Sequence, residues 1–328
     1  MSNKTYIDAV TRIHIKENYL LSEDFLEQMV QAEDYDAALS LLAEKNWGCD
    51  GDGQLVSRDM KDIIQFERDR AWSLMREVLH EDIRELDIFL IPIDYHNLKA
   101  AIKETRLNHE MEDIFMDQGA FPVEMVREAV QTKEFDKLPD RMAKVGEEAL
   151  GVFLRTGDAQ LTDTMIDKAA MEELVATAET LDSEALRTYA ELTVVAANIK
   201  TVLRAIKTGK GQEYLEQALA ECKTLNRTAL MKVALVGIDE LDDYLAGTDY
   251  ADGVAEFTKS MSAFERWCDN LMIKRMRNQK WNPFGIDPLA AYVLACESER
   301  KSVRIILSGK LNGLPEDAIR ERIRETYA

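Results

Sequence analysis

Two short patterns each recur three times along this chain of 328 residues, with an offset of about 100 residues between copies. The first pattern lies in apolar stripes of helical spacing: Asn97-Leu98-Lys99, Asn198-Ile199-Lys200 and Ser302-Val303-Arg304, followed by Ile102, Leu203 and Leu307. The second places an acid and an aromatic after an aliphatic residue: Val30 with Asp34-Tyr35, Val130 with Glu134-Phe135 and Leu245 with Asp249-Tyr250. Chance matches occur in any helical protein. Because the two patterns alternate along the chain, however, they favour one helical unit repeated three times.

The stripes predict long helices, and the chain has only 15 Gly and 6 Pro to interrupt them. The clearest stripe runs from Leu186 to Ile206. A second runs from Trp72 to Leu90 and is expected to break at Pro92, with Asp94 as the N-cap of the next helix. A third is opened by Asp287-Pro288 and closed by Gly309. The fold class predicted is therefore all-α.

The period sets the expected domain organisation. Three repeats are expected at residues 1–116, 117–228 and 229–328, with boundaries near the glycine-containing stretches 117–122 and 208–211. Helix-turn-helix solenoids repeat every 34–47 residues or so, which is much shorter than the period found here. Three larger helical units arranged around one another fit the sequence better than a stack of helix pairs.

Charge narrows the classes of partner. Sixty-one acidic and 41 basic side chains give a formal net charge of -20, which repels nucleic-acid phosphates and anionic lipid headgroups. Neither nucleic-acid binding nor direct lipid insertion is expected. The N-terminus lacks the apolar core of a signal peptide, and no apolar run approaches the roughly 20 residues that span a bilayer. Any membrane role is expected to be peripheral. The four cysteines are far apart, as in a reduced protein whose thiols are buried.

A search for catalytic, cofactor or metal sites finds none that fits. Residues 48–53 resemble a calcium loop, but Leu55 and Lys61 occupy the positions of the required Gly and Glu, so a tight acidic turn is expected. The stretch Thr208-Gly-Lys-Gly211 lacks the phosphate-binding frame and is expected to end a helix. The histidines His14, His96 and His109 share no helical face. The acidic run 239–243 would suit a magnesium enzyme only if paired with a second such helix, and is interpreted as a solvated face.

One dense basic cluster stands out in this acidic chain: Lys274, Arg275, Arg277 and Lys280. Cations at the end of a helix complement its dipole, which is the ordinary explanation. The alternative hypothesis is a docking patch for an acidic partner.

The segment Asp94-Tyr95-His96-Asn97-Leu98-Lys99 resembles the D-x-H-N-L-K signature of the family of V/A-type ATPase C subunits, also called d or AC39. The tail from Asp287-Pro288-Leu289 to Gly313-Leu314-Pro315 is similar to the family's closing pattern, although residues 299–302 depart from it. The resemblance implies a non-catalytic, funnel-shaped subunit on the cytoplasmic face of the membrane. It also implies one copy per complex, joining the central stalk to the membrane rotor ring and coupling ATP turnover to proton or sodium transport.

The recurring signature residues are predicted to be structural: Asp94, His96, Asn97, Lys99, Asn198, Lys200 and Arg304. An Asn on a helix can satisfy backbone groups of a neighbouring segment that would otherwise be buried without partners. A different function class stays open, namely a free-standing helical adaptor that binds protein partners in a groove between its repeats.

Overall fold

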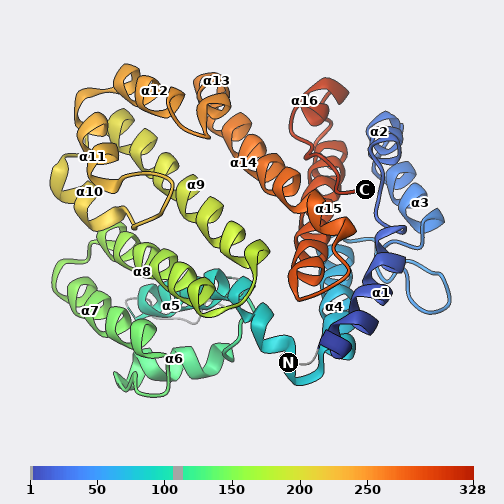
Figure 1. Cartoon of the computed structure of the whole chain (residues 1–328), viewed down its shortest axis with the longest axis horizontal. Coiled ribbons are helices and arrows are strands. Elements are labelled where there is room, and N and C mark those ends of the chain that lie inside the picture. Colours follow the sequence, from blue (N-terminus) through green and yellow to red (C-terminus); the bar gives the residue numbers. More distant parts are fainter. Residues whose placement is uncertain (1–2, 106–113) are drawn as a thin grey trace. The chain divides into compact units, whose positions relative to one another are not determined.

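The computed structural model describes residues 3–105 and 114–328, and this part of the chain is all-α, as predicted (Figure 1). Within it, the extended pairing is a single isolated bridge between Cys49 and Leu55. The first half contains α1 (Asn3–Glu17), α2 (Glu23–Gln31), α3 (Tyr35–Glu44), α4 (Met60–Leu79), η1 (His80–Phe89), α5 (Ile91–Glu104), α6 (Val123–Thr132), α7 (Asp140–Thr156) and α8 (Ala159–Thr180). The second half contains α9 (Glu184–Thr208), α10 (Gln212–Ala218), α11 (Arg227–Val236), α12 (Ile238–Ala246), α13 (Ala251–Lys259), α14 (Met261–Met276), η3 (Arg277–Trp281), α15 (Asp287–Leu311) and α16 (Glu316–Arg320).

The helices gather into two compact units. Unit 1 comprises Met1–Ile83, Ser183–Ala185 and Gly253–Ala328, and unit 2 comprises Arg84–Asp182 and Leu186–Asp252. Unit 1 therefore combines helices from the first and third predicted repeats. The boundaries 1–116, 117–228 and 229–328, and the funnel, stay predictions.

Unit 1 is built around α15, which contacts α1, α2, α3, α4, α14 and α16. This helix is buried on several sides, and Leu289, Val303, Ile306 and Leu307 lie in the interior. Val303, Ile306 and Leu307 join a core with the side chains of α2 and α3. Close packing of this kind resists deformation because neighbouring side chains leave few voids.

Unit 2 has a comparable centre in α5, which contacts α6, α7 and α8. Leu98 and Ile102 of α5 lie in a core with Val130, Phe135 and Ile166. Phe135 is the aromatic residue of the second recurring pattern, and it packs against Gly146 of α7, where an added Cβ would lie 2.8 Å from the ring. The aromatic of the recurring pattern thus helps to close the α6–α7 pair onto α5.

The second pattern coincides with helix–turn–helix junctions. Asp34 caps α3 by accepting a hydrogen bond from the Ala37 backbone N–H (2.8 Å), directly after α2 ends. Glu134 and Phe135 lie between α6 and α7, and Asp249 and Tyr250 lie between α12 and α13. The recurrence therefore marks the same step of the chain, the turn between two consecutive helices.

Three local predictions were wrong. Asp94 is not an N-cap, because α5 already begins at Ile91 and carries Pro92 in its first turn, where the missing N–H costs nothing. The stripe from Trp72 to Leu90 is not one helix, since α4 ends at Leu79 and the next residue, His80, has a φ of +51°. Gly309 does not close the last long helix, which continues to Leu311 and ends before Gly313 at φ +63°. Gly309 instead provides space for Ile319 of α16.

The prediction that the cysteine thiols are buried holds for two of the four. Of the four free cysteines, Cys49 and Cys296 are buried, whereas Cys222 and Cys268 are only half-buried, which corrects the expectation that all are buried.

The stretch 208–211 ends a helix, as expected: α9 stops at Thr208, and the next residue, Gly209, has a φ of +65°. His109 lies outside the described residues. No described helix is both long and apolar enough to cross a membrane.

Candidate functional site

The first signature helix, α5, holds a later segment of the chain against itself through Asn97. The Asn97 side chain is buried, donates from Nδ2 to the carbonyl of Met116 (2.8 Å) and accepts at Oδ1 from the Met116 N–H (2.9 Å). One amide therefore satisfies both backbone groups of a single residue. We call this arrangement a clamp, and the segment that it holds, residues 114–121, the clamped segment.

Two neighbouring signature residues grip the same segment. His96 Nε2 donates to the carbonyl of Ile114 (2.9 Å), and Asp94 Oδ1 accepts from the Phe121 N–H (3.2 Å). Asp94 lies so close to Gly119 that a Cβ there would be 2.2 Å from its Oδ1. Asp94, His96 and Asn97 thus hold three points of one segment.

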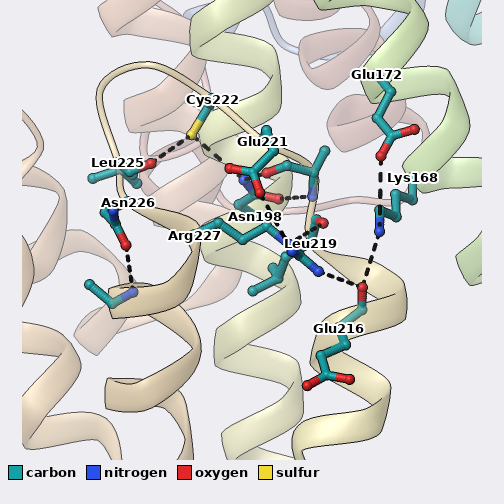
Figure 2. Close-up of polar contacts among 12 residues, drawn as sticks. Lys168, Glu172, Asn198, Glu216, Leu219, Glu221, Cys222, Leu225, Asn226 and Arg227 are labelled. Carbon is teal, nitrogen blue, oxygen red and sulfur yellow. Dashed lines mark hydrogen bonds and ion pairs between the residues drawn. The ribbon is translucent and has the colours of Figure 1, made fainter.

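The second signature helix, α9, repeats the clamp. Asn198 Nδ2 donates to the carbonyl of Ala220 (2.9 Å), and Asn198 Oδ1 accepts from the Ala220 N–H (3.1 Å). Figure 2 shows Asn198 facing the chain around Cys222, whose Sγ lies 3.8 Å from Asn198 Nδ2. Asn198 and Ala220 are both buried, so these backbone groups have no access to water.

The end of α10 is held beside this clamp by cations. Arg227 donates to the carbonyls of Leu219 (3.0 Å) and Glu216 (2.7 Å), and Lys168 donates to the Glu216 carbonyl (3.1 Å), as Figure 2 shows. Positive side chains at the C-terminus of a helix bind the last carbonyls and interact favourably with its dipole. The segment after α9 is therefore held by an amide and by two cations.

In the third copy, on α15, the clamp residue is a serine, and its hydroxyl takes the place of the asparagine amide. Ser302 is buried, and its Oγ accepts from the Arg324 N–H (3.3 Å). The clamped residue follows the signature residue by 19 positions in the first copy and by 22 in each of the others. The same helix position therefore contacts the same downstream part of the chain three times.

Two carboxylates occupy the same position, three residues before the clamp residue, in the first and third copies. Burial raises the pKa of Asp94 to about 6, although the Phe121 and Ala120 N–H groups oppose the rise. Burial likewise raises the pKa of Glu299 to about 7, opposed by its bonds from the Leu21 N–H (2.5 Å) and Trp47 Nε1 (2.6 Å). In the second copy the position holds Val195.

Glu299 was missed as a site residue because it lies in the stretch that departs from the family pattern. The signal that could have found it is its register, since both Asp94 and Glu299 precede the clamp residue by three positions. Glu299 holds Leu21 and Trp47, which lie in the connections before α2 and after α3, against α15.

The basic signature residues lie at the surface of their helices. Lys99 pairs with Asp167 (2.5 Å) and Lys103 with Asp163 (2.7 Å), and both pairs join α5 to α8. Lys200 is half-buried on α9, and Arg304 is exposed on α15. Exposed ion pairs of this kind contribute little, about 0–1 kcal/mol each.

The basic cluster lies at the end of α14 and in η3. Lys274 and Arg275 are exposed in the last turn of α14, and Lys280 is half-buried. Arg277 is engaged within the unit, donating to the Thr326 carbonyl (2.6 Å) and pairing with Glu325 (3.2 Å). Arg277 therefore holds the C-terminal tail, a role that Lys274 and Lys280 do not share.

Sites for metal ions or for catalysis would need clusters of reactive side chains. The described residues contain no group of three or more His, Cys, Asp or Glu side chains placed to hold a metal ion. Residues 48–55 form a tight turn in which Asp50 Oδ1 accepts from the N–H groups of Asp52 and Gln54 (3.0 Å each), so this carboxylate already serves the backbone. A groove of about 650 Å³ on α7 has Phe135, Leu150 and Met165 in its lining, but no histidine, cysteine or serine.

Comparison with known proteins finds the family that the signature at residues 94–99 resembles. The model of a family described as ATP synthase (C/AC39) subunit matches residues 9–322. The chain belongs to the ATP synthase (C/AC39) subunit family. The expected signature at residues 94–99 of this C/AC39 protein is thus the part of α5 that clamps residues 114–121.

Individual relatives in the comparison are similar along nearly their whole length. The chain is 21% identical over 319 residues to the C subunit of the V-type sodium ATPase of Enterococcus hirae, covering 95% of this chain and 96% of the relative. It is 24% identical over 324 residues to the C subunit of the V-type ATP synthase of Thermus thermophilus, covering 97% of each. It is 23% identical over 348 residues to the C subunit of the A-type ATP synthase of Methanocaldococcus jannaschii, covering 96% of this chain and 84% of the relative.

Proposed function

We propose that this chain is a non-catalytic coupling subunit of the central rotor of a V/A-type ATPase or ATP synthase. It links the central stalk to the membrane rotor ring, so that torque couples ATP synthesis or hydrolysis to proton or sodium transport. The observation that carries the proposal is the family match over residues 9–322, which spans nearly the whole chain.

The clamps support a mechanical role. A subunit that transmits torque has to deform little, and connecting segments are the parts of a helical protein that yield most easily. Asn97, Asn198 and Ser302 each tie such a segment to a long helix. Close-packed helices joined in this way transmit strain because their interiors have low compressibility.

The attachment is proposed to be protein to protein. A net charge of -20 opposes binding to anionic lipid, so the chain is held at the cytoplasmic face by the stalk and the ring, one copy per complex. The relatives differ in what their names say: one is part of a sodium ATPase and another of an ATP synthase. The coupling ion and the working direction belong to the partner chains.

The proposal is tested by isolating the chain from its own membranes. The chain is tagged at its genomic locus, the membranes are solubilised in mild detergent, and the co-purified proteins are identified by mass spectrometry. Stalk and ring proteins of a rotary ATPase are the expected result, at one copy of this chain per complex. Recovery of the chain with unrelated proteins, and without ATPase components, would instead support the free-standing adaptor.

The coupling role has its own test. In membranes from cells lacking the chain, the catalytic head is expected to retain ATP hydrolysis, whereas ATP-driven ion uptake into vesicles is lost and returns when the gene is restored. Ion uptake at the wild-type rate without the chain would contradict the role.

A further inference from the structure

Residues 281–286, which run from the last residue of η3 to the start of α15 and are called the loop below, present aromatic side chains to solvent. Trp281 is 81% exposed and Phe284 is 53% exposed. Side chains of this size usually bury most of their surface, so two in one short loop are informative. They mark unit 1 as having a surface suited to contact with another molecule.

The C-terminal part of helix α1 meets this loop at one point. His14 Nε2 lies 3.4 Å from the Asn282 carbonyl, which brings α1 against the loop. The next residue, Ile15, is 56% exposed, and Tyr19, four positions later, is 75% exposed. We call Ile15, Tyr19, Trp281 and Phe284 the apolar patch.

Hydrogen bonds hold the loop that carries the patch. The Asn282 backbone N–H donates to the Gln279 carbonyl (3.0 Å), and Asn282 Nδ2 donates to Gln279 Oε1 (2.9 Å). Asn282 Oδ1 in turn accepts from the Phe284 N–H (3.1 Å). A surface that is ordered before binding loses less conformational entropy when a partner arrives.

Positive charge precedes the loop along the chain, at the end of α14 and in η3. Lys274 and Lys280 have no ion pair with any carboxylate in residues 3–105 and 114–328, and Lys16 lies over the Tyr19 ring at 5.9 Å. Arg277, by contrast, is neutralised by Glu325. In a chain with a net charge of -20, these two lysines supply positive charge on the elements that lead into the loop.

We propose that the apolar patch, with Lys274 and Lys280, is a docking surface for an acidic and apolar segment of another protein of the same rotary ATPase. This inference rests on the proposed function and deepens it by assigning a contact surface and the chemistry of its partner. Exposed aromatics beside cations are the composition of interface hot spots. A protein is favoured over the bilayer because the net charge repels anionic headgroups.

The first experiment places a photo-crosslinker in the patch. The variant Trp281→p-benzoylphenylalanine is expressed in the native cells and irradiated, and the cross-linked peptide is identified by mass spectrometry. The matched control is Leu311→p-benzoylphenylalanine, at the other end of α15, where the side chain is 65% exposed. Position 281 is expected to cross-link to a segment of an ATPase protein that is rich in Asp or Glu and contains apolar residues, and position 311 is not.

The second experiment reverses the charge. The double variant Lys274→Glu/Lys280→Glu is expected to reduce retention of the chain in the detergent-solubilised complex at least tenfold at low salt, while its melting temperature stays that of the wild type. The control is Lys61→Glu/Lys232→Glu, whose lysines are exposed elsewhere on the chain. Retention equal to that control would overturn the proposal.

The outcomes separate the two proposals. Failure of the wild-type chain to co-purify with ATPase components refutes the proposed function. Co-purification accompanied by cross-links from position 281 only to lipid, only to a second copy of this chain or to no molecule refutes the docking surface and leaves the proposed function intact.

Discussion

The clamps of unit 2 and the clamp of unit 1 hold equivalent segments with different chemistry. In unit 2, Asn97 and Asn198 each satisfy the N–H and the C=O of one backbone residue. In unit 1, Ser302 accepts a single, longer bond from the Arg324 N–H (3.3 Å). An amide donates and accepts at once in a fixed plane, whereas this hydroxyl makes only one of the two bonds.

The C-terminal tail of unit 1 compensates through other side chains. Asn270 accepts from the Glu325 N–H (2.9 Å), Asp269 pairs with Arg324 (2.8 Å) and Arg277 donates to the Thr326 carbonyl (2.6 Å). In unit 2, one asparagine thus makes the main hydrogen bonds that hold each segment, whereas in unit 1 several side chains share them. A substitution should therefore cost more in unit 2.

Asn198→Ala tests the concentrated clamp and is expected to have the largest effect. It leaves the N–H and C=O of Ala220 buried without partners, at about 1–3 kcal/mol for each group, so the free energy of unfolding should fall by about 2–6 kcal/mol. Urea unfolding followed by circular dichroism measures it, with Lys207→Ala on the same helix as the control. Unchanged stability together with loss of complex assembly would show that Asn198 contacts a partner instead.

Asp94→Asn tests the carboxylate that assists the first clamp. Because the pKa of Asp94 is raised from 3.8 to about 6, the folded state binds the proton more tightly than the unfolded state. The resulting stabilisation is fully present below about pH 4 and is lost as the pH rises through 6, by an amount on the order of 3 kcal/mol.

The asparagine variant keeps an oxygen for the Phe121 N–H and cannot titrate. The difference in unfolding free energy between wild type and Asp94→Asn should therefore change between pH 4 and pH 7. Glu299 titrates in both proteins and cancels in this comparison. A difference that is constant with pH would show that Asp94 ionises normally.

Gly119→Ala tests how closely the clamped segment approaches α5. The new Cβ would lie 2.2 Å from Asp94 Oδ1, so either the segment or the carboxylate must move. A loss of about 1–3 kcal/mol is expected, as for overpacking elsewhere. Gly211→Ala, where the Cβ meets no atom within 4 Å, is the control. Equal melting temperatures for the two variants would refute the close approach.

Ser302→Ala is expected to have the smallest effect, about 1 kcal/mol, because it removes one hydrogen bond from a tail that is held at several other points. Thermal unfolding beside Asn198→Ala measures the contrast directly. A loss as large as that of Asn198→Ala would refute the distributed attachment of unit 1.

Much of this arrangement could be predicted from local spacing. The stripe from Leu186 to Ile206 corresponds to α9, and the all-α class follows from such stripes and from the scarcity of glycine and proline. Helix boundaries were less predictable. Asp94 has the residue type of an N-cap but is buried at the clamp, since Pro92 is tolerated in the first turn of α5.

The helical character, the threefold recurrence and the family signature can all be predicted from the sequence alone, because each depends on residues within a few positions of one another. The partners of the clamps cannot be read in this way, since they lie 19 to 22 residues downstream and are brought to the clamp residues by packing. The raised pKa values of Asp94 and Glu299 have the same origin, because desolvation depends on which segments cover a carboxylate. The exposure of Trp281 and Phe284 is likewise a property of the folded loop, which leaves two apolar side chains outside the core.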